Sequence, residues 1–358
     1  MVNKKYIFAT IAAILTLASL IAGTIILNQT VSQKAVQNEL LSRLQAEEGT
    51  YHPRRLVLQG LDEETVQKLS SQLQSTYRRS VDEQVFALTL PEDMTVVQAV
   101  EERALLPYLS YLSADYYAEL CGEVFTSKEI PSAIELMADI NLQNTWDVTT
   151  GQGITVAILD TGIDTDNSYF TGRISEMSYN AHEDKVVADY GWEIIEDTYG
   201  HGTNMASAIA ATPNPNTGVC GVAPGAELLV IKADNGKTGK DYELTLSDLL
   251  FAMAYAIERD VDIICMSVAV SGPVNYFEKY TQLAVDSDIM IIAAAGNQGG
   301  SVLHWPAADE NVIGVGCVDN GMLDLLKRIA LPRLSAISLM KLHRIPYQKY
   351  PTTAITAT

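Results

Sequence analysis

The fold is decided by residues 151–164, which read GQGITVAILDTGID. Ile154 to Leu159 form a short apolar run with glycines on both sides of it, which is typical of a buried strand in a parallel sheet. Asp160 ends that predicted strand, and open α/β sheets place their functional sites at this edge. An isolated Asp there would only start a turn. The whole stretch instead predicts an α/β fold with Asp160 at its site.

A second motif follows at residues 199–206, which read YGHGTNMA. His201 precedes a stretch whose apolar residues recur at helix spacing, and Gly200 and Gly202 allow another backbone to approach closely. A single His at a helix start is most often structural. Asp160 and His201 are, however, the residue types that fit a pair in which a carboxylate fixes the tautomer of an imidazole that takes a proton.

The two motifs together resemble the Asp and His segments of subtilisin-like serine proteases, whose triad runs in the order Asp, His, Ser. The resemblance implies peptide-bond hydrolysis, with Asp160 and His201 as catalytic residues. It also implies a mostly parallel sheet with helices on both faces. The family's usual HGTHVAG is altered here at Asn204, Met205 and Ser207.

Later segments continue the resemblance. Residues 261–267 (VDIICMS) resemble the family's substrate-binding strand, which implies substrate-binding roles for Ser267, Val268 and Ala269. Ala269 stands where the family prefers Gly, so the groove is expected to be narrower for a pairing substrate. Residues 289–297 (IMIIAAAGN) end in the family's Ala-Gly-Asn signature. That signature adds two substrate-binding residues and an oxyanion-hole donor: Ala295, Gly296 and Asn297.

The expected third partner is missing from the printed sequence, which has no Gly-Thr-Ser-Met-Ala motif. Ser335 and Ser338 lack the glycine and the helix start that a nucleophile needs. Residues 321–358 carry +5 of a total charge of −20, so residues 1–320 carry −25. This abrupt change predicts a basic tail foreign to the fold, from a shifted reading frame or a disrupted gene. A genuine divergent C-terminus is the alternative.

The N-terminal segment is apolar from residue 6 to residue 27 and follows Lys4 and Lys5. As a helix it would span about 33 Å, enough to cross a membrane. We expect residues 1–29 to be a signal anchor, with a cleaved signal peptide as the alternative. In either case the remainder of the chain would be extracytoplasmic, either membrane-anchored or secreted.

Residues 30–120 predict a β-α-β-β-α-β unit, an order that resembles the inhibitory propeptide of these proteases. A plain accessory domain is the alternative. Residues 121–139 are then a linker holding the cleavage junction. Residues 140–320 are the incomplete peptidase domain, which would interact with a peptide or protein substrate and with its own propeptide-like domain.

Charge and residue types narrow the other functions. The acidic balance argues against nucleic-acid binding. Calcium is a candidate cofactor through Asp164 and Asp166, although two nearby carboxylates are more often a solvated loop. Four cysteines, at positions 121, 220, 265 and 317, assign no disulfide. Two functions remain: a serine endopeptidase that is inactive without its Ser segment, or a non-catalytic relative that binds peptides or a partner protease.

Overall fold

The computed structural model describes residues 32–121, 142–270, 276–297 and 304–316, which group into two compact units. The first unit contains residues up to 78 and residues 86–115, and the second contains residues 79–85 and the chain from 116 onwards. The predicted anchor (residues 6–27) and the basic tail (321–358) lie outside the described ranges. None of the described helices is both long enough and apolar enough to cross a bilayer.

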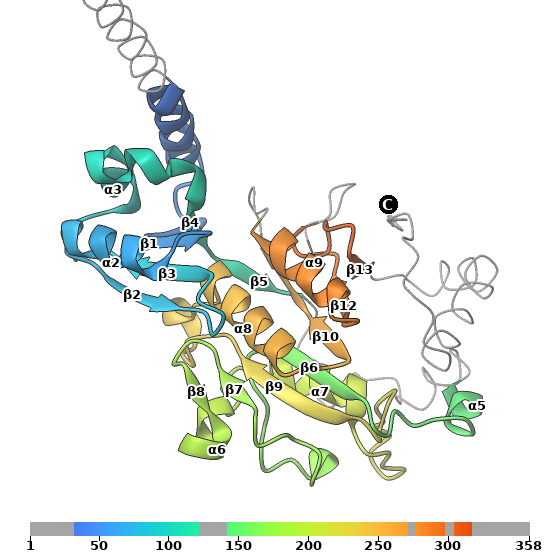
Figure 1. The fold of residues 1–358 in the computed structure, drawn as a ribbon. Coiled ribbons are helices and arrows are strands. Elements are labelled where there is room, and N and C mark those ends of the chain that lie inside the picture. Colours follow the sequence, from blue (N-terminus) through green and yellow to red (C-terminus); the bar gives the residue numbers. More distant parts are fainter. Residues whose placement is uncertain (1–31, 122–141, 271–275, 298–303, 317–358) are drawn as a thin grey trace, which may run out of the picture. The chain divides into compact units, whose positions relative to one another are not determined.

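In the first unit a helix over residues 32–46 precedes the predicted β-α-β-β-α-β order (Figure 1). Its elements are β1 (Tyr51–Gln59), α2 (Glu63–Gln72), β2 (Thr76–Arg79), β3 (Val85–Thr89), α3 (Val96–Glu101) and β4 (Leu112–Tyr116). The strands form one sheet in the order β2-β3-β1-β4. The second helix of this order, α3, ends at Glu101. A 3-10 helix containing Pro107 follows it, because proline has no N–H to continue an α-helix.

The second unit is built on a seven-stranded sheet in the order β13-β12-β10-β6-β9-β7-β8. Its strands are β6 (Thr155–Asp160), β7 (Tyr179–Asn180), β8 (Lys185–Val186), β9 (Glu227–Lys232), β10 (Ile263–Met266), β12 (Met290–Ala294) and β13 (Val312–Val315). Only the pairing of β7 with β8 is antiparallel. The prediction of a mostly parallel sheet is therefore confirmed.

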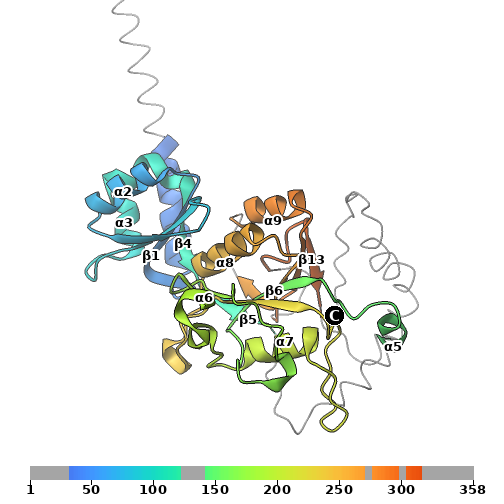
Figure 2. The same cartoon turned by 60° about the horizontal axis from the view of Figure 1, so that its bottom comes forward.

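Helices cover both faces of this sheet, as the sequence predicted. In Figure 2, α8 (Leu246–Glu258) and α9 (Phe277–Asp286) lie on one face, and α7 (His201–Ala210) lies on the other. Ala206 and Ala210 of α7 pack against a core that includes Ile158 of β6 and Val230 of β9. Small side chains let α7 lie close to the sheet, so its first residue comes close to the end of β6. Two short helices, α5 (Leu142–Trp146) and α6 (Val187–Tyr190), also belong to the second unit.

A separate two-stranded sheet also belongs to the second unit. β5 (Ala118–Leu120) pairs antiparallel with β11 (Val268–Val270), with Ala269 opposite Glu119. The strand of Ala269, the residue expected to narrow the groove for a substrate, makes this pairing. Side chains point out of the plane of a sheet, so an Ala Cβ does not obstruct backbone pairing.

Candidate active site

Asp160 and His201 lie side by side in the second unit. Asp160 is the last residue of β6 and His201 the first of α7, and His201 Nδ1 is 2.7 Å from Asp160 Oδ1. Both residues are only 1% exposed, and the Thr161 N–H donates to the same carboxylate oxygen. With its Nδ1–H donating to Asp160, the imidazole presents Nε2 as the atom that exchanges protons.

The segment before α7 is held by a carboxylate that sequence reasoning did not single out, Asp197. Its two oxygens accept from five donors: the backbone N–H groups of Tyr199, Gly200 and Thr203, and the hydroxyls of Thr161 and Thr203. The N-terminus of a helix presents unsatisfied N–H groups, and a carboxylate satisfies them well. Asp197 therefore joins the turn after Asp160 to the helix start that carries His201.

The electrostatics of the pair favour a charged imidazole. Burial lowers the pKa of His201, but the hydrogen bond to Asp160 and its negative charge raise it more, so the pKa lies above its ordinary value of 6.5. For Asp197 burial acts in the opposite direction and raises the pKa, because here the charged form is the deprotonated one. Its hydrogen bonds to Thr203, Gly200 and Thr161 outweigh burial and hold that pKa below 3.8.

We expect Asp160→Asn to lower the pKa of His201, because the substitution removes the charge that stabilises the imidazolium. The measurement is a titration of the ring nitrogens by ¹⁵N NMR, with His201→Gln used to assign the signal. Asp164→Asn is the matched control, since the Asp164 carboxylate accepts only from the nearby Asp166 N–H among its described bonds. If His201 titrated with the same midpoint in Asp160→Asn and in the unmodified chain, the charge of Asp160 would not be what raises its pKa.

The same shift links the pair to stability. The folded-state pKa lies above the 6.5 of a free side chain. The stabilisation from protonated His201 is therefore fully present below pH 6.5, and it is lost as the pH rises through the folded-state pKa.

An extended segment of the chain itself lies beside this pair, and we call the place that it occupies between β11 and residues 244–245 the cleft. The Cys121 N–H donates to Ser267 O at 2.7 Å, and Ser267 Oγ donates to Cys121 O at 2.6 Å. On the other edge, the Ala118 N–H donates to Leu244 O at 2.7 Å. The segment ending at Cys121 is thus the middle strand between β11 and residues 244–245.

This segment delivers a peptide carbonyl to the imidazole. His201 Nε2 lies 3.0 Å from Cys121 O. Since Nδ1 donates to Asp160, a hydrogen bond from Nε2 to a carbonyl requires both ring nitrogens to carry protons. That state agrees with the raised pKa of His201, to which the Cys121 carbonyl itself contributes.

The predicted oxyanion donor lies at the cleft, one residue away from the expected carbonyl. Asn297 Nδ2 donates to Leu120 O at 3.0 Å, not to the Cys121 carbonyl that faces His201. The predicted substrate-binding residues are also at the cleft: Ser267, Val268 and Ala269 pair with the segment, and Ala295 and Gly296 precede Asn297 at the end of β12. Sequence reasoning missed the occupant, Cys121. Ser335 and Ser338 lie outside the described residues.

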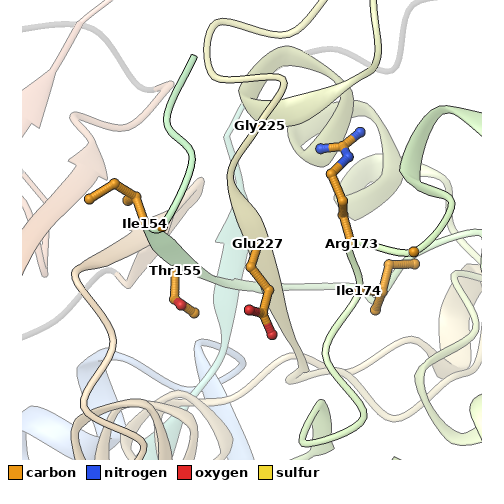
Figure 3. A pocket seen from close by; sticks show the side chains of 8 residues that line it. Ile154, Thr155, Arg173, Ile174, Gly225 and Glu227 are labelled. Carbon is orange, nitrogen blue, oxygen red and sulfur yellow. The ribbon is translucent and has the colours of Figure 1, made fainter. Parts of the chain in front are cut away.

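Two other features do not take part in this site. Among the described residues, no group of three His, Cys, Asp or Glu side chains could hold a metal, so Asp164 and Asp166 make no calcium site with a third such ligand. A pocket lined by Ile154, Arg173 and Glu227 lies at the N-terminal ends of β6 and β9, whereas Asp160 lies at the C-terminal end of β6 (Figure 3). There the Arg173 guanidinium donates to protein oxygens, including Ala226 O and Thr212 Oγ1.

Comparison with protein families agrees with this geometry. The model of the subtilase family, Peptidase_S8, matches residues 151–354, more than half of the chain. The chain belongs to the subtilase family. The match extends into the basic tail that we expected to be foreign to the fold. The prediction of a subtilisin-like protease family is therefore confirmed.

The curated relatives of this subtilase include serine proteases of bacteria. It is 37% identical over 196 residues to the intracellular serine protease of Paenibacillus polymyxa, covering 53% of this chain and 56% of that protein. It is 34% identical over 203 residues to the major intracellular serine protease of Bacillus subtilis (strain 168), covering 55% and 60%. The alignments thus span little more than half the length of these relatives.

Solved structures share the subtilase fold. Fervidolysin from Fervidobacterium pennivorans, a keratinolytic enzyme related to subtilisin, superposes with a TM-score of 0.58 at 20% identity. That superposition covers 75% of this chain and 43% of fervidolysin. The epidermin leader peptide processing serine protease from Staphylococcus aureus (S393A mutant) gives a TM-score of 0.57 at 18% identity, covering 75% and 71%. At these identities the similarity concerns the fold alone.

Proposed function

We propose that the second unit is the substrate-binding and acid–base part of a serine endopeptidase site, with His201 as general base and Asp160 as its orienting carboxylate. One observation carries the proposal: a peptide carbonyl, Cys121 O, lies 3.0 Å from His201 Nε2 at the end of a strand-paired segment. The contact places the imidazole beside an extended peptide backbone, as peptide hydrolysis needs, and His201 becomes a base once Nε2 has given up the proton that it donates here.

The chemistry follows from these positions. A Ser hydroxyl at the end of the held segment would give its proton to Nε2 and attack the carbonyl, while Asp160 stabilises the resulting imidazolium. Asn297 is the side-chain donor for the oxyanion. Losing such a donor costs about 100- to 1000-fold in rate, a magnitude measured in subtilisin itself. In the present arrangement the Asn297 amide donates to Leu120 O, so it has to move to the next carbonyl as charge develops there.

We further propose that residues 30–120 act as an inhibitory propeptide, with residues 118–121 filling the cleft and the cut following Cys121. The pairing on both edges supports this, because a segment held between β11 and Leu244 blocks any other peptide. Residues 6–27 remain our proposed anchor, with the rest extracytoplasmic. Protection of the folded part from external protease in intact cells would contradict that location.

The expected activity of the printed chain is nil or very low, because no nucleophile motif was found. A triad without its Ser retains roughly 1000- to 10,000-fold acceleration over water, which is far below useful hydrolysis. The measurement is labelling of the purified full chain by a fluorophosphonate, which reacts with activated serines. No labelling is expected.

Two variants make this test decisive. Ala118→Pro removes the N–H that donates to Leu244 O, so it loosens the segment and opens the cleft to the probe. His201→Ala removes the base, with His52→Ala in the first unit as its matched control. Labelling that appears with Ala118→Pro and disappears with His201→Ala would contradict inactivity and reveal a nucleophile. Peptide binding without labelling would favour the non-catalytic relative.

A further inference from the structure

The side chains of the cleft segment differ in burial. Ala118 and Cys121 are 7% and 4% exposed, whereas Glu119 is exposed and Leu120 half-buried. The two residues that the cleft encloses are thus the smallest of the four. Cys121 is also the residue whose carbonyl faces His201, so the space around its thiol decides which side chain fits beside the reacting bond.

Backbone groups lie next to the Cys121 thiol. The thiol reaches Glu119 O at 3.9 Å and lies near the Gly296 N–H, and burial raises its pKa to about 11, so the group enclosed here is the neutral SH. Val268 and Ala269, on the strand that pairs with the segment, are buried as well. Backbone that is packed against other groups moves aside for a larger side chain only if those groups give way.

An imidazole lies against Gly296. A Cβ built on Gly296 would come within 2.6 Å of His304 Cδ2 and 3.3 Å of His304 Cγ, so the ring lies directly against the glycine. The His304 N–H donates to Ala295 O, and the next residue, Trp305, accepts from the Val270 N–H through its carbonyl. His304 is therefore fixed from both sides to the strands that form the cleft.

We propose that His304 is a specificity-determining residue, whose imidazole lies against Gly296 and restricts the Cys121 position of a bound peptide to small side chains. This inference rests on the proposed function of the cleft. The substrate class is an extended peptide with Cys, Ala or Ser at that position and a second small residue three positions earlier, where Ala118 lies. A bulky residue meets Gly296, against which His304 lies, and overpacking forces the segment out.

The test is amide hydrogen exchange on the full chain, because the Ala118 and Cys121 amides are protected only while the segment is seated. Cys121→Phe is expected to speed their exchange by about ten- to a hundredfold. Cys121→Ala, which leaves the side chain small, should exchange like the unmodified chain. The double variant Cys121→Phe/His304→Ala should recover protection, because Gly296 then has room to move.

Two outcomes of this exchange experiment would show that His304 does not limit the side chain at position 121. Unchanged protection in Cys121→Phe, or no recovery in the double variant, would overturn the proposal. Exchange in β6 and β9 reports in the same experiment whether the domain stays folded. If His304→Ala disturbs those strands, His304→Ser in the double variant gives the same comparison with a polar side chain. Exchange needs no nucleophile, so a chain that fails to hydrolyse peptides leaves this result interpretable.

Discussion

Replacing Gly202 by alanine is expected to destabilise the second unit by about 3 kcal/mol or more. An added Cβ would lie 2.2 Å from Gly162 O and 3.2 Å from Asp160 Oδ1. In a helix, alanine is ordinarily more stable than glycine by about 1 kcal/mol. The collision is with backbone that cannot rotate away, so it outweighs this gain. The turn after Asp160 would have to move, and the contact of Asp160 with His201 would open.

Chemical denaturation followed by tryptophan fluorescence measures this loss. All three tryptophans, at positions 146, 192 and 305, belong to the second unit, so the signal reports on the correct part of the chain. Ser207→Ala in the same helix is the control and should change stability by no more than about 0.5 kcal/mol. If Gly202→Ala were as stable as that control, α7 could not lie as close to the turn as described.

Replacing Lys232 by methionine is expected to cost about 3–5 kcal/mol, because it leaves a buried carboxylate without its countercharge. Lys232 Nζ lies 2.6 Å from Asp234 Oδ1, and the two side chains are 5% and 0% exposed. Burial already holds the pKa of Asp234 above its ordinary value, despite the opposing charge of Lys232. Lys232 also donates to Thr161 O, so its loss frees the residue that follows Asp160.

A double substitution separates the charge from the packing. Lys232→Met/Asp234→Leu removes both charges and should recover most of the stability lost by Lys232→Met alone. Lys237→Met, at an exposed lysine five residues further on, is the control and should be nearly neutral. A double variant as unstable as the single one would mean that the bond to Thr161 O, rather than the ion pair, makes Lys232 necessary.

The sequence predicted those parts of the site that depend on local pattern. The apolar run of β6 and the helix-spaced residues after His201 place Asp160 and His201 at element ends, and such ends meet at one edge of a parallel sheet. The element order of the first unit follows from period and turn signals in the same way. The acceptor roles of Asp197 depend on the shape of one turn, which residue spacing does not reveal.

Contacts between distant parts of the chain were not predictable. β5 pairs with β11 across about 150 residues, and two three-residue strands carry no signal that would select each other. The donation from Asn297 to Leu120 O depends on that register. A lysine is unexpected at the end of the apolar strand β9. Only the proximity of Asp234, which the spacing of residues does not reveal, explains why the charge of Lys232 is tolerated there.

The position of β6 in the middle of the sheet has a consequence for biosynthesis. Ile158 pairs with Val230 on one side and with Cys265 on the other, so both neighbours of this apolar strand come later in the chain. At about 5–20 residues per second, Cys265 is synthesised roughly 5 to 20 s after Ile158. Throughout that interval at least one edge of β6 is open, and apolar strands with open edges join strands of other chains. We therefore expect the yield of folded protein to fall when many copies are translated together.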